Sequence, residues 1–250
     1  MTSILFVNPL TLPIDLVEQK WNSDEASVQT LAQEGVSLPM GIMYLSAYIK
    51  KSIPSINVSL LDYRVESANA NEYSSLDGFI SEIANSEVSS PPDILAFSLI
   101  VSSSHLFFKR CLKILKRIWP NTTVILGGFH ATNYTAELLE LEDVDYVFRG
   151  ESEYALSEFL STYPDGHSLP VGVVSRLDRF FPMNNKCEIL RSIDDNPIPD
   201  YGLPDMERYI TGNTRMVIKK GDDKGIRAAN IITSLGCPFS CTFCASHTVH

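Results

Sequence analysis

The chain has 250 residues, 44% of them hydrophobic, with 20 Lys and Arg against 30 Asp and Glu. This length and apolar content suffice for one large or two modest globular domains. The acidic excess lies in residues 1–160, which hold 10 basic and 20 acidic residues. Because phosphate binding requires clustered basic charge, we expect no nucleic-acid partner.

No apolar run approaches the roughly 18 residues that span a bilayer, and no basic segment precedes the apolar N-terminal stretch. The five cysteines are odd in number and three of them are clustered, which disfavours a disulfide framework and favours a reducing compartment. The sequence therefore predicts a cytoplasmic protein with no membrane partner. Its oligomeric state does not follow from the sequence.

Residues 1–160 alternate short β-branched apolar runs with segments of helical periodicity. The predicted strands are residues 4–7, 58–62, 94–99, 123–126 and 145–148, and the predicted helices are residues 41–51, 76–84, 105–118, 135–141 and 153–161. This alternation predicts an α/β fold, a flavodoxin-like or Rossmann-like doubly wound domain with a five-stranded parallel sheet. The polar stretch 10–37 predicts a loop, either a lid over the strand tips or an excursion without function.

Polar residues and glycines follow the predicted strands, where doubly wound sheets bind ligands. Glycines permit close backbone approach to a ligand, and hydroxyls offer hydrogen bonds. The candidate binding residues are Asn8, Ser98, Ser102, Gly127, Gly128, His130, Gly150 and Glu151. By residue type alone, a tight turn explains the glycine pair equally well, and a lone histidine is more often a hydrogen-bonding loop residue than a metal ligand.

Residues 161–224 are punctuated by Pro, Gly and Asp and predict a linker. It contains one predicted hairpin, formed by residues 171–176 and 187–190. Cys111, on the apolar face of a predicted helix, and Cys187, in the hairpin, are expected to be small packed residues.

Three cysteines near the C-terminus, Cys237, Cys241 and Cys244, follow an apolar run with CxxxCxxC spacing. Thiolates select zinc, copper(I) or iron–sulfur clusters. Zinc usually takes four ligands, and only His247 and His250 follow the motif, so zinc and unrelated thiols are the weaker alternatives. A cluster held by three cysteines leaves one iron open to a small molecule.

The apolar run from Ile231 to Gly236 and the motif that follows it resemble the strand and cluster loop that open the barrel of radical S-adenosylmethionine (SAM) enzymes. The resemblance implies that Cys237, Cys241 and Cys244 hold a 4Fe–4S cluster, and that Phe243 lies beside the SAM bound to its open iron. It also implies an electron donor. A full barrel needs roughly a hundred or more further residues, so we expect residues 225–250 to be a fragment of that domain and the chain alone to be inactive.

Asn8-Pro9, the run ILGGFHAT at 125–132 and the run DYVFRGESE at 145–153 resemble the cobalamin-binding domain that precedes many radical SAM barrels. The resemblance implies that residues 1–160 form this domain. The corrin would then lie on the strand tips, next to the eight candidates, with its nucleotide tail entering the sheet edge. The loop after the first strand lacks the histidine with which mutase-type domains ligate cobalt.

These features together predict the N-terminal part of a cobalamin-dependent radical SAM enzyme that acts on a small molecule, with methyl transfer as one possible reaction. Two alternatives stay open. One is a radical SAM protein whose first domain has lost cobalamin, and the other is a non-catalytic cobalamin-binding module.

Overall fold

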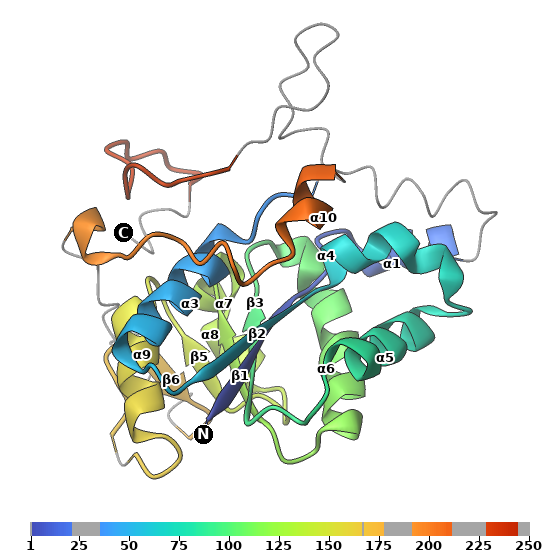
Figure 1. Ribbon diagram of the computed structural model, residues 1–250, viewed down its shortest axis with the longest axis horizontal. Coiled ribbons are helices and arrows are strands. Elements are labelled where there is room, and N and C mark those ends of the chain that lie inside the picture. The colour runs from blue at the N-terminus through green and yellow to red at the C-terminus, as the bar shows by residue number, and fades with distance from the viewer. Residues whose placement is uncertain (1, 22–35, 167, 178–191, 212–228, 245–250) are drawn as a thin grey trace, which may run out of the picture.

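A six-stranded sheet with the order β2-β1-β3-β4-β5-β6 forms the centre of the computed structural model, which describes residues 2–21, 36–166, 168–177, 192–211 and 229–244 (Figure 1). The strands are β1 (Ser3–Asn8), β2 (Asn57–Asp62), β3 (Ile94–Ser98), β4 (Thr123–Gly127), β5 (Tyr146–Phe148) and β6 (Val173–Ser175). β1 to β5 are parallel, and β6 is antiparallel to β5. The order 2-1-3-4-5 confirms the predicted flavodoxin-like α/β class.

Helices cover both faces of the sheet (Figure 1). The helices of the doubly wound part are α3 (Met40–Ser52), α4 (Tyr63–Glu66), α5 (Leu76–Glu87), α6 (His105–Ile118), α7 (Phe129–Asn133), α8 (Thr135–Leu139) and α9 (Glu153–Thr162), with 3-10 turns η1 (Ser67–Glu72) and η2 (Ser102–Ser104). α3 and α9 pack on one face, and α5, α6 and α8 on the other.

The alternation of side chains along each strand explains this layering. In β1, Ile4 and Phe6 belong to the core under α3 and α9, whereas Leu5 and Val7 belong to the core under α5 and α6. A strand that is buried on both faces needs apolar residues at every position, which is why these strands read as continuous apolar runs. The second core continues through α6, whose Phe107 and Phe108 are fully buried.

β6 corrects the predicted strand count, and it lies in the first half of the predicted hairpin. Val173 to Ser175 pair with Phe148 to Tyr146 of β5 and close the edge of the sheet, so the sheet has six strands and not five. A strand of three residues in a Pro- and Gly-rich stretch is too short to be predicted from its sequence pattern. It forms here because the edge of β5 has backbone groups available for pairing. The second half of the predicted hairpin, residues 187–190 with Cys187, lies outside the described residues.

Helix α1 (Ile14–Trp21) corrects the prediction of a patternless loop over residues 10–37. Val17 is fully buried in the core under α5 and α6, and Glu18 forms an ion pair with Arg110 of α6. Among residues 14–19 of this helix, whose side chains the structure describes, only Val17 is buried, which is too weak a periodic signal to detect in the sequence. Residues 22–35 lie outside the described part of the chain.

The linker segment (residues 192–211) crosses α3 from the start of α9 to the end of β2 (Figure 1). It contains η4 (Ile193–Asp195) and α10 (Met206–Thr211). Asp200 anchors its middle, because its carboxylate accepts hydrogen bonds from Ser46 Oγ at 2.7 Å and Lys50 Nζ at 2.6 Å. Burial raises the pKa of Asp200, but these two donors hold it below its usual value overall.

The cysteine segment (residues 229–244) contains no strand within its described residues, which corrects the expectation of a barrel strand before Cys237. A strand exists only where a neighbouring strand supplies hydrogen bonds, and the described residues provide none beside it. The division of the chain at residues 160 and 224 stays a prediction.

Candidate functional site

A pocket of about 360 Å³ lies at the carboxyl ends of β1, β3, β4 and β5, between the sheet and helices α3 and α9. Apolar side chains of the sheet form its floor and those of the two helices form its walls. The floor consists of Phe6, Ala96, Ile125 and Phe148, and the helical walls include Ile42, Leu45 and Leu156. Its position at the strand tips is where doubly wound domains bind ligands.

Two glycines shape this strand-tip pocket in different ways. Gly128 has φ +99°, and a Cβ atom there would lie 2.6 Å from the carbonyl oxygen of Leu99, so only glycine allows the β3 and β4 tips to approach. The bond from His130 N–H to Leu99 O at 2.9 Å fixes that approach. Gly41 of α3 also lines the pocket, and a Cβ atom there would meet nothing within 4 Å. The missing side chain of Gly41 leaves open space for a ligand.

The structure brings five of the eight predicted binding residues together at the pocket: Ser98, Gly127, Gly128, Gly150 and Glu151. Other residues that line it were not among the eight candidates, namely Gly41, Phe129, Ser152, Glu153, Ile232 and Leu235. Phe129, Ser152 and Glu153 belong to the runs at 125–132 and 145–153, whose position at the strand tips follows from the sequence. Ile232 and Leu235 come from a distant segment, and no local signal indicates them.

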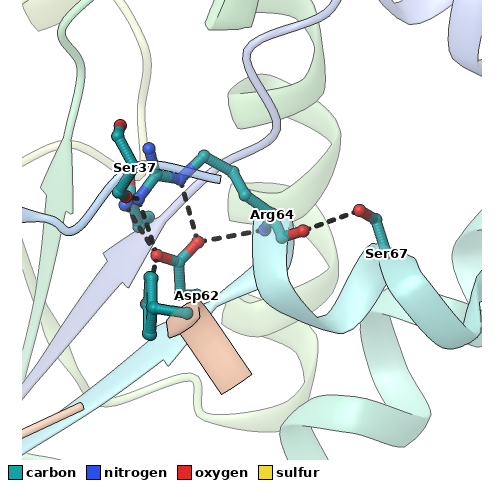
Figure 2. A network of polar contacts seen from close by, with 6 residues as sticks. Ser37, Asp62, Arg64 and Ser67 are labelled. Atoms are coloured by element: carbon teal, nitrogen blue, oxygen red, sulfur yellow. Dashed lines mark hydrogen bonds and ion pairs between the residues drawn. The ribbon is translucent and has the colours of Figure 1, made fainter. Parts of the chain in front are cut away.

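Asn8 lies at the tip of β1 but does not line the pocket, and its predicted contact with a cofactor stays a prediction. Its side chain is buried, and Nδ2 donates to Asp62 Oδ2 at 3.0 Å. Figure 2 shows Asp62 at the centre of a polar network in which Arg64 donates from Nε and Nη2 at 3.0 and 2.8 Å. The hydroxyl of Tyr209 in α10 donates to the same carboxylate at 2.7 Å. Asn8 therefore supports the β1 and β2 tips and the docking of α10.

Ser102 and His130 also lie at the strand tips but not in the lining of the pocket. Ser102 Oγ is 3.0 Å from His130 Nδ1, and His130 Nε2 is 3.1 Å from His105 Nδ1. Both ring nitrogens of His130 are therefore engaged, and neither is available to a metal in this arrangement. The hydrogen bonds to both neighbours make His130 a connector between the β3 and β4 tips.

We expect the two histidines to make stability depend on pH. Burial lowers the pKa of His105, assisted by Lys109, and burial lowers the pKa of His130, assisted by His105 and opposed by Glu137. Unfolded imidazoles bind protons near pH 6.5, so below that pH the unfolded state holds more protons than the folded one. The stability contributed by the neutral rings is complete above pH 6.5 and is lost as the pH falls towards the folded pKa values.

Urea unfolding of the wild type and of His130→Gln at pH 7.5 and 5.5 measures this effect. The wild type should lose more free energy of unfolding between the two pH values than the variant does. Subtracting the variant removes the contribution of the carboxylates, which both proteins share. Equal losses in the two proteins would rule out this origin of the pH dependence.

Two carboxylates, Glu151 and Glu153, line the pocket at the start of α9. Burial raises the pKa of Glu153, and the charge of Glu151 adds to this, while hydrogen bonds from backbone N–H groups and from Asn196 oppose it. Among the described residues, Glu153 Oε2 and Asn196 Oδ1 are buried without a hydrogen-bond partner. Buried acceptors of this kind are costly unless a donor reaches them.

The three cysteines of the motif lie in the cysteine segment. Cys237 and Cys241 are exposed, Cys244 is partly buried, and the backbone N–H of Cys244 donates to Cys241 O at 3.1 Å. No three His, Cys, Asp or Glu side chains converge into a metal-binding group within the described residues. Phe243 is 92% exposed. The donor chemistry suits a cluster, but the described geometry does not gather the thiols, and their role stays a prediction.

Comparison with known proteins identifies the doubly wound part of the chain. The model of the B12 binding domain family matches residues 28–160, more than half of the chain and the region that builds most of the pocket. The chain belongs to the B12-binding domain family. This match confirms that the strand-tip motifs are those of a cobalamin-binding domain.

Three curated relatives extend beyond the B12-binding domain. The chain is 29% identical over 216 residues to the uncharacterized methyltransferase PH0819 of Pyrococcus horikoshii, covering 83% of this chain and 40% of the relative. It is 24% identical over 221 residues to the anaerobic magnesium-protoporphyrin IX monomethyl ester cyclase of Cereibacter sphaeroides, covering 80% and 32%. It is 30% identical over 162 residues to the cobalamin-dependent radical SAM methyltransferase TokK of Streptomyces tokunonensis, covering 61% and 22%.

The chain thus spans less than half the length of each of these relatives. Across the part of the chain that the structure describes, no helix is both long enough and apolar enough to cross a bilayer.

Proposed function

We propose that this chain is the cofactor-binding part of a cobalamin-dependent radical SAM enzyme. The observation that carries the proposal is the strand-tip pocket, most of whose lining lies in the residues matched by the B12 binding domain. Its apolar floor and the open space at Gly41 suit a flat apolar ring such as the benzimidazole of the nucleotide tail. The buried acceptor Glu153 Oε2, on a residue that lines the pocket, suits the amide N–H groups that surround a corrin.

In this proposal Ser98, Gly127, Gly128, Gly150 and Glu151 contact the corrin, and the pocket below them holds the nucleotide tail. When bound, cobalamin supplies a cobalt ion that can carry a methyl group. The residues of the chain bind and orient it, and the apolar floor excludes water. Methyl transfer to a small-molecule substrate is the proposed reaction, in keeping with two relatives that are named methyltransferases.

The cysteine motif supplies the second cofactor site in the proposal. Cys237, Cys241 and Cys244 would hold a 4Fe–4S cluster, because three thiolates are its usual protein ligands when one iron is left to SAM, and Phe243 would lie beside the SAM. When bound, the cluster would supply the electron for reductive cleavage of SAM, and the proposal therefore includes an external electron donor. The spacing of the cysteines supports this assignment.

Reconstitution tests both sites. The chain is incubated without oxygen with iron, sulfide and hydroxocobalamin and then desalted, and cobalt, iron and sulfide per chain are measured. We expect about one cobalt and about four irons per chain. Iron without cobalt would favour a first domain that has lost cobalamin. Cobalt without iron would favour a cobalamin-binding module.

Replacing Gly41 with tryptophan separates binding in the pocket from adventitious binding. Gly41 lines the pocket and a Cβ atom there meets nothing within 4 Å, so an indole at this position has room to occupy the space that a ligand would take. We expect the affinity for hydroxocobalamin, measured by equilibrium dialysis, to fall about tenfold or more. Gly41→Ala is the matched control and should bind normally. Equal affinity of both variants would place the corrinoid elsewhere on the chain.

A further inference from the structure

The hydroxyl of Tyr44 connects α3 to the cysteine segment. It accepts a hydrogen bond from Ile232 N–H at 3.2 Å and donates to Ile232 O at 3.5 Å. One side chain thus satisfies both backbone groups of a residue 188 positions later in the chain. The Tyr44 side chain is buried, so the hydroxyl is presented from a rigid position.

A second tyrosine supports the same segment from the linker. The Tyr201 hydroxyl donates to the carbonyl oxygen of Asn230. The preceding residue, Asp200, is itself bound to α3 through Ser46 and Lys50 and through a bond from its N–H to Met43 O at 3.1 Å. Tyr44 is therefore part of α3, and Tyr201 directly follows a residue that is hydrogen-bonded to α3.

These two contacts place the residues before the cysteine motif at the pocket. Ile232 and Leu235 contribute to its lining, and Cys237 follows Leu235 by two positions. Apart from these contacts the segment is loosely packed, since Ile231 is 64% exposed and Phe239 is 71% exposed. An occupant of the pocket would touch Ile232, the residue that Tyr44 holds, while Tyr201 holds Asn230 two positions before it.

We propose that Tyr44 and Tyr201 are positioning residues that make residues 230–235 one wall of the strand-tip pocket, so that a corrinoid in the pocket stabilises the segment leading into the cysteines. The inference rests on the proposed function for the identity of the ligand. Because coupling between two sites is reciprocal, a loosened wall must also weaken corrinoid binding, by at most the factor with which the bound corrinoid stabilises the wall.

Hydrogen–deuterium exchange of the peptides that cover residues 229–244, followed by mass spectrometry, tests the proposal. Cyanocobalamin is the probe, because its axial cyanide prevents reaction with the cysteines. In the wild type, cyanocobalamin should slow the exchange of residues 230–235. In Tyr44→Phe, exchange without ligand should be roughly two- to tenfold faster, as expected for one lost hydrogen bond, and the affinity for cyanocobalamin should fall.

Tyr48→Phe is the matched control. Tyr48 lies one turn further along α3, and its ring packs edge-on against Tyr154 with centroids 5.4 Å apart, away from the cysteine segment. It should behave as the wild type in both measurements. The phenylalanine keeps the ring of Tyr44 in its place, and unchanged exchange in the central strands would verify that the variant is folded.

The outcomes separate the two proposals. If cyanocobalamin binds the wild type but leaves the exchange of residues 230–235 unchanged, the positioning role is wrong and the proposed function stands. The positioning role is equally wrong if Tyr44→Phe retains full protection and affinity. If cyanocobalamin fails to bind the wild type, the proposed function is wrong, and the inference fails with it.

Discussion

Asp62→Ala is expected to lower the free energy of unfolding by about 3–5 kcal/mol, because it leaves a buried guanidinium without its counter-charge. The side chains of Asp62 and Arg64 are only 4% and 13% exposed. Arg64 also donates from Nη2 to Ser37 O at 3.0 Å, as Figure 2 shows, so it cannot turn to solvent without breaking further contacts. Urea unfolding monitored by circular dichroism measures the loss.

The loss should extend beyond the ion pair, since Asp62 also accepts from Tyr209. Burial and the charge of Asp62 raise the pKa of Tyr209, so its hydroxyl keeps its proton and loses its acceptor in the variant. A bidentate pair between Arg208 and Glu66, at 2.6 and 2.7 Å, is then the main polar link between α10 and α4. We expect α10 to detach before the sheet unfolds.

Asp77→Ala is the control for Asp62→Ala. Asp77 also pairs with an arginine, Arg110, at 2.6 Å, but its side chain is 56% exposed. Exposed pairs contribute about 1 kcal/mol or less, because water and salt screen them. Similar losses in the two variants would show that burial does not set the contribution of the Asp62 pair.

Gly128→Ala is the second change with a large expected effect, a loss of about 3 kcal/mol or more in the free energy of unfolding. The backbone at Gly128 has φ +99° and ψ 176°, a conformation that side-chain-bearing residues rarely adopt. The added methyl would also lie 2.6 Å from Leu99 O and 2.9 Å from its carbonyl carbon, and backbone atoms cannot move aside as a side chain would. Thermal or urea unfolding measures the loss.

The neighbouring glycine offers a matched control one residue away. A Cβ atom at Gly127 would meet only Phe148 O, at 3.9 Å, and its φ is not positive. Gly127→Ala should therefore change the free energy of unfolding by about 1 kcal/mol or less. If Gly128→Ala were as mild as Gly127→Ala, the contact between the β3 and β4 tips would not limit stability.

Local patterns in the sequence predicted most of the doubly wound domain. The boundaries of α6 agree with the prediction, because apolar residues recur every three or four positions along the whole helix. α1 and β6 were missed because each is short and is stabilised by distant partners, Arg110 for the first and β5 for the second. Propensity over a few residues is weaker than such tertiary contacts.

The sequence by itself determined the α/β class, membership of the cobalamin-binding domain family and the position of candidate residues at the strand tips, because apolar periodicity and motif spacing are local properties. Only the tertiary structure decided which candidates face the pocket. In the folded chain Asn8 forms a hydrogen bond with Asp62, and Tyr44 forms one with Ile232. Both ring nitrogens of His130 also take part in hydrogen bonds. Those partners lie far apart in the chain, so their contacts depend on how whole layers pack, which no local pattern encodes.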